Sequence, residues 1–303
     1  RLPTPEEVRG FLADTAPKKR ERLVDLLLAR PEFVDYWSYK WADIFLVTGS
    51  ALRPAAVEAY ASWIRDRVAE NMPWDELVRQ AITATGSSVE NGATNFFAVH
   101  QDPETMAENT SQAFLSLSIG CAKCHNHPLE KWTNDQYYAF ANLFARVRAK
   151  GWGGDARNGD GVRTLYVEPR GDLLQPRTGR ALPPAPLDGV PLDPDSPADR
   201  REALAAWLTS PDNPYFTRSI ANRVWANFFG IGLVNPVDDL RATNPASNDT
   251  LLTALATFTA EHGYDLKALM RLILLSETYR RGSRCCRKTR GIGSGLPVPI
   301  PPG

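Results

Sequence analysis

The chain has no excess of charge of either sign: among its 303 residues, 35 Lys and Arg residues balance 35 Asp and Glu residues. No overall field therefore draws it toward nucleic acid or an anionic membrane, and we expect neither as a partner. Long apolar runs are also missing. Stretches such as Ile44 to Val47 fall far short of the ~20 residues that a membrane helix requires, so we expect no membrane span.

Cysteine is scarce, and its four residues form two close pairs, Cys121/Cys124 and Cys285/Cys286. Four cysteines are too few for a disulfide-built scaffold in a chain of this length. A hydrophobic fraction of 43%, with 10% aromatic residues, is enough for a real core, which excludes disordered and fibrous classes. At roughly 150 residues per domain, the length predicts about two domains.

The signatures of several common enzyme classes are absent. The chain has no Gly-rich phosphate loop, no Gly-x-Ser-x-Gly motif and no His-Glu-x-x-His motif. The adjacent carboxylates of Asp238 and Asp239 diverge, so capping or an ion pair with Arg241 is expected instead of acid–base catalysis. The acidic residues of 153–161 lack the alternating spacing of an EF-hand, so calcium is not expected. The sequence leaves open whether the protein is an enzyme, and it offers no catalytic residues.

Helical periodicity dominates the chain on both sides of a segment rich in Gly and Pro. Before residue 150 the apolar residues recur at spacings of 3 and 4. From 151 to 195 this period is lost, and Thr164–Val167 and Asp172–Leu174 are predicted as short strands. We therefore predict a mainly α fold, with a helical domain at 1–150, a linker or small β insert at 151–195 and a second helical domain at 196–283.

Helix starts are marked by a small polar residue followed by Pro or an acid. They are predicted at Thr4-Pro5, Pro17, Pro31, Pro54, Pro73, Pro103, Thr133, Pro197, Pro214, Asn248 and Asp265. Gly86–Gly92 is predicted as a loop, and Tyr137, Phe140, Phe144 and Val147 as one buried helical stripe. Trp37, Trp41 and Phe45 recur at helical spacing, so they are expected in the core. We expect the two helical blocks to pack on each other, because the segment between them has little apolar content.

One short motif carries chemistry. Cys121-Ala122-Lys123-Cys124-His125 has the Cys-x-x-Cys-His pattern that attaches c-type haem, in which two thiols reach the vinyl groups and the neighbouring His binds the iron. The apolar line that runs from Met106 predicts the motif at a helix C-terminus. We therefore expect haem c on Cys121, Cys124 and His125, with His125 on the haem iron and Met106 or His100 as candidates for the other axial position.

Zinc is the main alternative cofactor, with the ligand set Cys121, Cys124, His125 and His127. Its difficulty is that neighbouring Cys124 and His125 point in divergent directions, and structural zinc sites usually take their second pair from a distant segment. A catalytic dithiol is also open, although dithiols of the thioredoxin type begin a helix. The remaining interpretation is a plain disulfide, or buried thiols with two histidines that cap neighbouring helices.

Longer strings around this motif resemble a known pair of families. The stretch from Phe114 through Trp132, followed by Tyr137-Tyr138, resembles the planctomycete secreted-cytochrome-associated domain, which is domain of unknown function 1549. Five later strings resemble its usual C-terminal companion, domain of unknown function 1553: Asn213-Pro-Tyr-Phe216, Asn222-Arg223-Val-Trp225, Gly230-Ile-Gly-Leu-Val234, Pro236-Val-Asp-Asp239 and Gly263-Tyr-Asp265. The resemblance covers residues 1 to about 283 and is expected to stop beyond Arg284.

The resemblance implies an exported protein, periplasmic or extracellular, of largely uncharacterised biochemical function. Such proteins are often fused to a separate cytochrome-c-like domain. The resemblance points to Cys121, Cys124 and His125 as the haem attachment set, with His127 and Trp132 as neighbours of unknown role. Our hypothesis is a redox or electron-transfer protein with one covalent haem, whose partner is a redox protein or a fused cytochrome domain. The alternative is a non-redox structural or binding module of an extracellular assembly, with a zinc site or a disulfide.

Residues 284–303 are predicted to be a disordered or non-native tail, because they have no apolar period. We predict that deletion of residues 285–303 shifts the thermal midpoint of unfolding by less than ~2 °C, since no buried area is lost. Thermal unfolding of the full and the shortened chain measures this shift. A fall of about ten degrees would mean that the tail packs on the helical domains.

Overall fold

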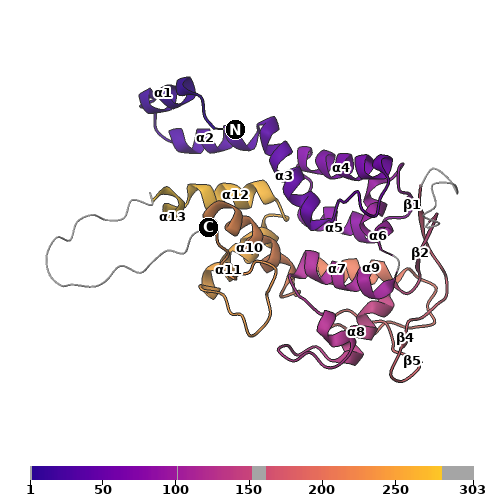
Figure 1. The fold of residues 1–303 in the computed structure, drawn as a ribbon. Coiled ribbons are helices and arrows are strands. Elements are labelled where there is room, and N and C mark those ends of the chain that lie inside the picture. The colour runs from indigo at the N-terminus through magenta and orange to yellow at the C-terminus, as the bar shows by residue number, and fades with distance from the viewer. Residues whose placement is uncertain (1, 101, 152–161, 282–303) are drawn as a thin grey trace, which may run out of the picture.

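Figure 1 shows the fold as a computed structural model that describes residues 2–100, 102–151 and 162–281. Most of these residues lie in helices and the strands are few and short, so the predicted mainly α fold is confirmed. No helix within these ranges is both long and apolar enough to cross a bilayer. The predicted tail at 284–303 lies outside the described residues, so the effect of deleting it stays a prediction.

The first helical block follows the predicted signals closely. Thr4 and Thr133 each close a capping box, and Asp102 accepts a hydrogen bond from the backbone N–H of Thr105. The helices are α1 (Pro5–Ala13), α2 (Lys19–Leu28), α3 (Pro31–Ile44), α4 (Pro54–Ala69), α5 (Trp74–Thr83), α6 (Asn95–Ala98), α7 (Pro103–Leu115) and α8 (Asn134–Ala141). Among the described residues, three 3-10 turns accompany them: η1 (Gly92–Thr94) between α5 and α6, η2 (Gly120–Lys123) between α7 and α8, and η3 (Asn142–Phe144) after α8.

The second helical block consists of five helices. They are α9 (Arg200–Leu208), α10 (Phe216–Phe229), α11 (Asp249–Glu261), α12 (Leu266–Leu275) and α13 (Glu277–Arg280). Asn248 and Asp265 cap α11 and α12 with their side chains, as predicted. Gly230 ends α10 in the left-handed conformation, at a φ of 76°, which costs a glycine little because it has no Cβ.

Three predicted helix starts are wrong: α10 begins at Phe216 and not at Pro214, and two others are displaced for a local reason. α2 does not begin at Pro17, because Lys18 adopts a left-handed φ of 61° that breaks the turn there. α9 does not begin at Pro197. It begins after Asp199, whose carboxylate accepts a hydrogen bond from the backbone N–H of Arg201 at 3.0 Å. At α2 and α9, Pro therefore precedes the first helical residue by two or three positions and is not itself that residue.

The short antiparallel strands gather at one side of the molecule, opposite α12 and α13 (Figure 1). β1 (Gly86–Ser87), β3 (Thr164–Val167) and β2 (Val147–Lys150) form one sheet in that order, and β4 (Leu174–Gln175) pairs with β5 (Arg180–Ala181). The strand predicted at 164–167 is confirmed, and the one predicted at 172–174 is displaced to β4.

Two predictions about this region are wrong, because strand pairing overrides local pattern. Gly86 does not lie in a free loop, since it pairs with Leu165. Val147 does not complete the helical stripe that begins at Tyr137, since it pairs with Val167 in β2. Phe140 and Phe144 of that stripe are buried, as predicted, together with Tyr137.

One hydrophobic core runs through both helical blocks, so the prediction that they pack on each other is confirmed. Trp37, Trp41 and Phe45 are buried in it, as the helical spacing predicts. Trp37 also contacts Phe228 of α10, with 6.0 Å between the ring centroids. The aromatic side chains of α3 therefore join the first block to the second.

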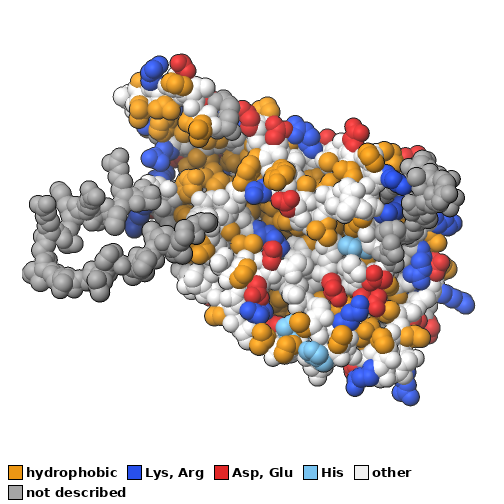
Figure 2. Space-filling view, viewed as in Figure 1, with side chains coloured by type: hydrophobic (Ala, Val, Ile, Leu, Met, Phe, Trp, Pro, Cys, Tyr) orange, Lys and Arg blue, Asp and Glu red, His pale blue; other side chains and the backbone are white. Residues whose placement is uncertain are grey.

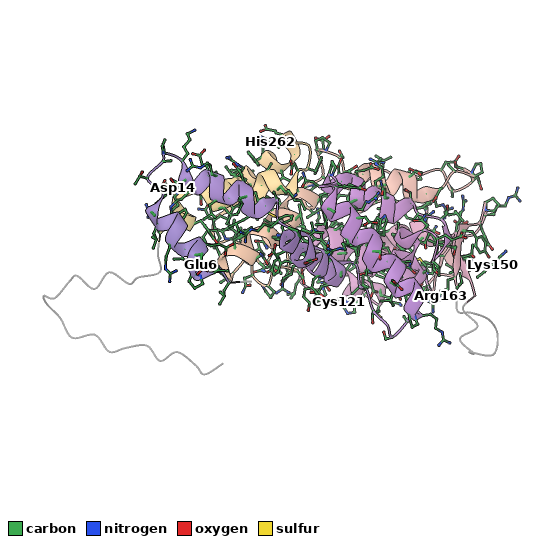
Figure 3. All side chains as sticks on the ribbon, turned by 90° about the horizontal axis from the view of Figure 1, so that it is seen from above. Glu6, Asp14, Cys121, Lys150, Arg163 and His262 are labelled. Carbon is green, nitrogen blue, oxygen red and sulfur yellow. The ribbon has the colours of Figure 1, made fainter. Side chains whose placement is uncertain are left out.

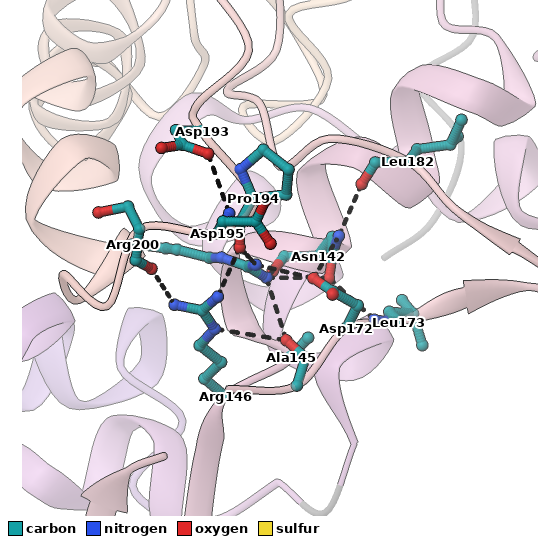
Figure 4. A network of polar contacts seen from close by, with 12 residues as sticks. Asn142, Ala145, Arg146, Asp172, Leu173, Leu182, Asp193, Pro194, Asp195 and Arg200 are labelled. Carbon is teal, nitrogen blue, oxygen red and sulfur yellow. Dashed lines mark hydrogen bonds and ion pairs between the residues drawn. The ribbon is translucent and has the colours of Figure 1, made fainter. Parts of the chain in front are cut away.

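Two buried arginines dock the segment after β3 against the first block (Figure 4). Arg200 donates to the carbonyl oxygen of Asn142 at 2.9 Å and pairs with Asp172 at 2.7 Å. Arg146 donates to the carbonyl oxygen of Pro194 at 2.7 Å. Only 3% of Arg146 and 4% of Arg200 are exposed. The described part of 162–195 is therefore held by buried, charge-assisted hydrogen bonds.

α1 and α2 project from the body of the molecule at its N-terminal end (Figure 1), and neither helix carries a buried residue. Apolar side chains gather on this projection (Figure 2). Leu12 is 69% exposed and Leu26 is 52% exposed, so these apolar side chains lie outside the shared core.

We predict that Arg200→Ala lowers the free energy of unfolding by roughly 2 to 4 kcal/mol, because it leaves buried acceptors without their donor. Urea unfolding measures the change. Arg177→Ala is the control: its side chain is 72% exposed and pairs loosely with Asp135 at 3.9 Å, so we expect a change below about 0.5 kcal/mol. Equal changes in the two variants would contradict a stabilising role for the buried network.

Candidate functional site

The Cys-x-x-Cys-His motif lies on a 3-10 turn of its own, and the prediction that it ends a helix is wrong. α7 stops at Leu115 because Ser116 takes a left-handed φ of 54°. That conformation is held by the second block: the Ser116 hydroxyl lies 2.7 Å from the Ser219 hydroxyl, and its carbonyl accepts from the backbone N–H of Leu240 at 2.9 Å. The chain then runs to η2, which carries Cys121, and Cys124 caps the end of this turn.

The 3-10 turn brings the two thiols to one side of the chain. Residues three apart eclipse each other in a 3-10 helix, and Cys121 and Cys124 have this spacing. Both are free and exposed, whereas Ala122 between them is buried. Figure 3 shows Cys121 at an outer edge of the body, away from both Glu6 in α1 and Lys150 in β2. Both thiols are therefore accessible from solvent.

His125 has the protonation pattern of a metal-binding imidazole. Its Nδ1 lies 2.7 Å from the carbonyl oxygen of Asn126. A carbonyl only accepts hydrogen bonds, so in the neutral ring Nδ1 carries the proton and Nε2 keeps its lone pair. Histidines that bind metals commonly donate their other N–H to such a backbone carbonyl. His125 is exposed, so its Nε2 is accessible from solvent.

His127 has the opposite pattern. Its Nδ1 accepts a hydrogen bond from the backbone N–H of Leu129 at 3.2 Å, so the neutral ring carries its proton on Nε2. The His127 backbone N–H donates to the carbonyl oxygen of Trp132 at 2.8 Å, which closes the loop after the motif. The two histidines are therefore not equivalent, although they lie two residues apart in the sequence.

The described residues contain no cluster of three or more His, Cys, Asp or Glu side chains arranged to hold a metal ion. The alternative zinc set of Cys121, Cys124, His125 and His127 is thus not gathered around one point. Zinc binding would require the loop after η2 to rearrange, and the tautomer of His127 to change.

Two family models match this chain, one over each helical block. The model described as "Protein of unknown function (DUF1549)" matches residues 1–149, and the one described as "Protein of unknown function (DUF1553)" matches residues 200–291. The chain belongs to this pair of families. The order of the two domains is as predicted, but the second match continues to residue 291 and does not stop at Arg284. No curated protein and no solved structure matches the chain.

The last aromatic residue of the DUF1549 motif contacts the DUF1553 domain. Trp132 is 1% exposed and lies edge-on to Tyr215, with 6.1 Å between the ring centroids. Lys131 Nζ lies 4.8 Å from the centre of the Trp132 ring and forms an ion pair with Asp188. The Tyr215 hydroxyl also donates to Asp188, at 3.2 Å. Trp132, whose role the sequence left unknown, therefore anchors the motif loop on the neighbouring domain.

Sequence reasoning missed two carboxylates beside the motif. Glu104 and Glu108 lie one turn apart on α7, and Glu108 accepts a hydrogen bond from the buried hydroxyl of Tyr137 at 2.6 Å. Lys123 of η2 lies 4.0 Å from Glu104. Burial raises the pKa of Tyr138, and the nearby Glu104 and Cys124 raise it further. The i, i+4 spacing of the two glutamates indicated that they share one face of a helix, but it did not show which residues lie opposite that face.

The two candidates for a second axial ligand are both engaged elsewhere. Met106 is 2% exposed and lies in the core. His100 is 9% exposed, and its Nε2 lies 3.0 Å from the side-chain nitrogen of Asn109, which donates to it. Either side chain would have to leave its present contacts before it could bind an iron.

Two weaker candidates from the sequence are also resolved. Asp239 lies 3.2 Å from Arg241, and Asp238 forms an ion pair with Arg223. Both carboxylates therefore serve as ion-pair partners, as expected for adjacent acids that diverge. The 153–161 stretch weighed for calcium and the pair Cys285/Cys286 lie outside the described residues.

We predict that His100 makes stability depend on pH. Burial lowers its pKa from 6.5 to about 4, so between these values the unfolded chain binds a proton that the folded chain does not. Stability is thus complete above pH ~6.5 and is lost as the pH falls, by about 2 to 3 kcal/mol at pH ~4.5. Urea unfolding at both pH values should show a smaller acid loss in His100→Gln than in the wild type. The exposed His262→Gln is the control and should match the wild type.

Proposed function

We propose that this protein is an exported c-type haem protein that transfers electrons. Cys121 and Cys124 would carry the porphyrin, and Nε2 of His125 would bind its iron. The observation that carries this proposal is the hydrogen bond of 2.7 Å from His125 Nδ1 to the Asn126 carbonyl, because it leaves Nε2 unprotonated on the residue that directly follows Cys124, and both thiols of the motif are free and exposed.

The residues fit the attachment chemistry. In each thioether, the cysteine sulfur bonds to one vinyl carbon and the thiol hydrogen moves to the other, so no oxidant is needed. The reaction requires thiols that are reduced, accessible and on one side of the chain, as Cys121 and Cys124 are. A bound haem would supply reversible exchange of one electron at its iron.

Several features favour haem over the alternative zinc site. A zinc site of four residues needs lone pairs from both histidines, and Nδ1 of His127 is occupied by the backbone of Leu129. Haem attachment needs only His125. The resemblance to a cytochrome-associated family and the motif together support a periplasmic or extracellular location. The exposed position of the motif suits contact with a redox partner or a fused cytochrome domain.

We predict that the protein, exported from a host with haem-maturation machinery, carries one covalent haem, detected by intact mass and by its absorption spectrum. His125→Ala should remove the low-spin or high-spin signature of the haem, because the iron loses its ligand. His127→Ala is the matched control and should only perturb it, since its Nδ1 already bonds to backbone.

Two other results would contradict the haem function and support the alternative. Stoichiometric zinc without haem, together with unfolding on chelation, would support the alternative of a structural or binding module with a zinc site. A mass two protons below that of the dithiol, without haem or metal, would support the disulfide form of the same alternative.

A further inference from the structure

The turn that carries the two cysteines is held by one buried side chain. Asn134, the first residue of α8, is 6% exposed. Its amide nitrogen donates to the carbonyl oxygens of Ala122 and Lys123, both at 2.8 Å. These carbonyls lie at the end of η2, where a helical turn leaves its acceptors without partners. Asn134 thus supplies the donors that close the turn between Cys121 and Cys124.

The same residue also reaches the histidine of the motif. The backbone N–H of Asn134 donates to the side-chain oxygen of Asn126 at 3.0 Å. The carbonyl of Asn126 in turn accepts from His125 Nδ1. One residue is therefore linked by hydrogen bonds both to the thiol turn and to the group that orients the imidazole.

Asn134 is itself fixed from a distant part of the chain. Gln175, in β4, is 1% exposed, and its amide nitrogen donates to the Asn134 side-chain oxygen at 2.6 Å and to Asp135 at 2.7 Å. The Gln175 side-chain oxygen accepts from the Thr178 hydroxyl at 2.7 Å. Because each amide group is engaged at both ends, neither can rotate without losing a buried hydrogen bond.

We propose that Asn134, held by Gln175, is a positioning residue that keeps Cys121, Cys124 and His125 in the geometry of one attachment site. The role of Asn134 in haem loading depends on the haem function proposed above. Its effect on the two thiols does not, because the thiols can be tested without haem. The segment after β3, which resembles a linker in sequence, thereby becomes part of the site.

The test measures how strongly the folded chain holds the two thiols together. Full-length protein without haem is equilibrated with reduced and oxidised glutathione. Two protein thiols lose two electrons and two protons to form the Cys121–Cys124 disulfide, and one oxidised glutathione accepts them to give two reduced glutathiones. Alkylation and mass spectrometry of the peptide that contains both cysteines give the equilibrium constant.

Asn134→Asp keeps the shape of the side chain but removes both donors to the turn. We expect the equilibrium constant for the disulfide to fall about tenfold, because the thiols lose their fixed proximity. Asn95→Asp is the matched control. Asn95 is also buried and donates to the backbone carbonyls of Ser88 at 2.7 Å, Gly92 at 3.1 Å and Ala56 at 3.4 Å, but these lie away from the motif. We expect its constant to stay within about twofold of the wild type, although it also loses stability.

Gln175→Ala provides a second variant in case Asn134→Asp does not fold, and its constant should fall about threefold. Unchanged constants in the Asn134 and Gln175 variants, or an equal fall in Asn95→Asp, would overturn the proposal. If the wild type takes up no haem but Asn134→Asp still shifts the constant, the haem function fails and the positioning role stands. If haem loads normally and the constant does not move in Asn134→Asp, the positioning role fails alone.

Discussion

The buried guanidinium groups of Arg146 and Arg200 are the constraint on which the rest of this structure depends. Both side chains place a positive charge in the interior, where water is largely excluded and each guanidinium needs oxygen atoms as hydrogen-bond acceptors. Burial and the charge of Arg200 lower the pKa of Arg146. The acceptors come mostly from backbone carbonyls, at Asn142, Gly171 and Pro194. The segment after β3 is therefore wrapped against the first helical block by hydrogen bonds more than by apolar burial.

That wrapping has a consequence at the motif. Because the segment is docked, β4 lies beside α8 and Gln175 can reach Asn134 at 2.6 Å. Asn134 then closes the turn that carries Cys121 and Cys124. On the other side of the motif loop, Trp132 packs against Tyr215 of the DUF1553 domain. The geometry around the thiols is thus set by three separate parts of the chain.

The sequence predicted most helices because capping and apolar periodicity act within a few residues. The capping boxes at Thr4 and Thr133 confirm this. Apart from the displaced helix starts, its failures lie where residues distant in the sequence determine the conformation. α7 ends at Ser116 because Ser219 and Leu240 bind that residue, and no pattern between Met106 and Cys121 could show this. Local spacing likewise favoured a helix through Val147. The structure has a strand there instead, because Val147 pairs with Val167, 20 residues later in the chain.

By itself, the sequence determined the helix caps, the membership of the shared core, the family pair and the one motif with chemistry. It could also place Cys121, Cys124 and His125 together, because they are neighbours in the chain. Only the tertiary structure decided that His125 and His127 differ, since each tautomer depends on which backbone group the ring meets. Only the tertiary structure brought Asn134 and Gln175 to the turn, because buried amides find their partners after the chain has folded around them.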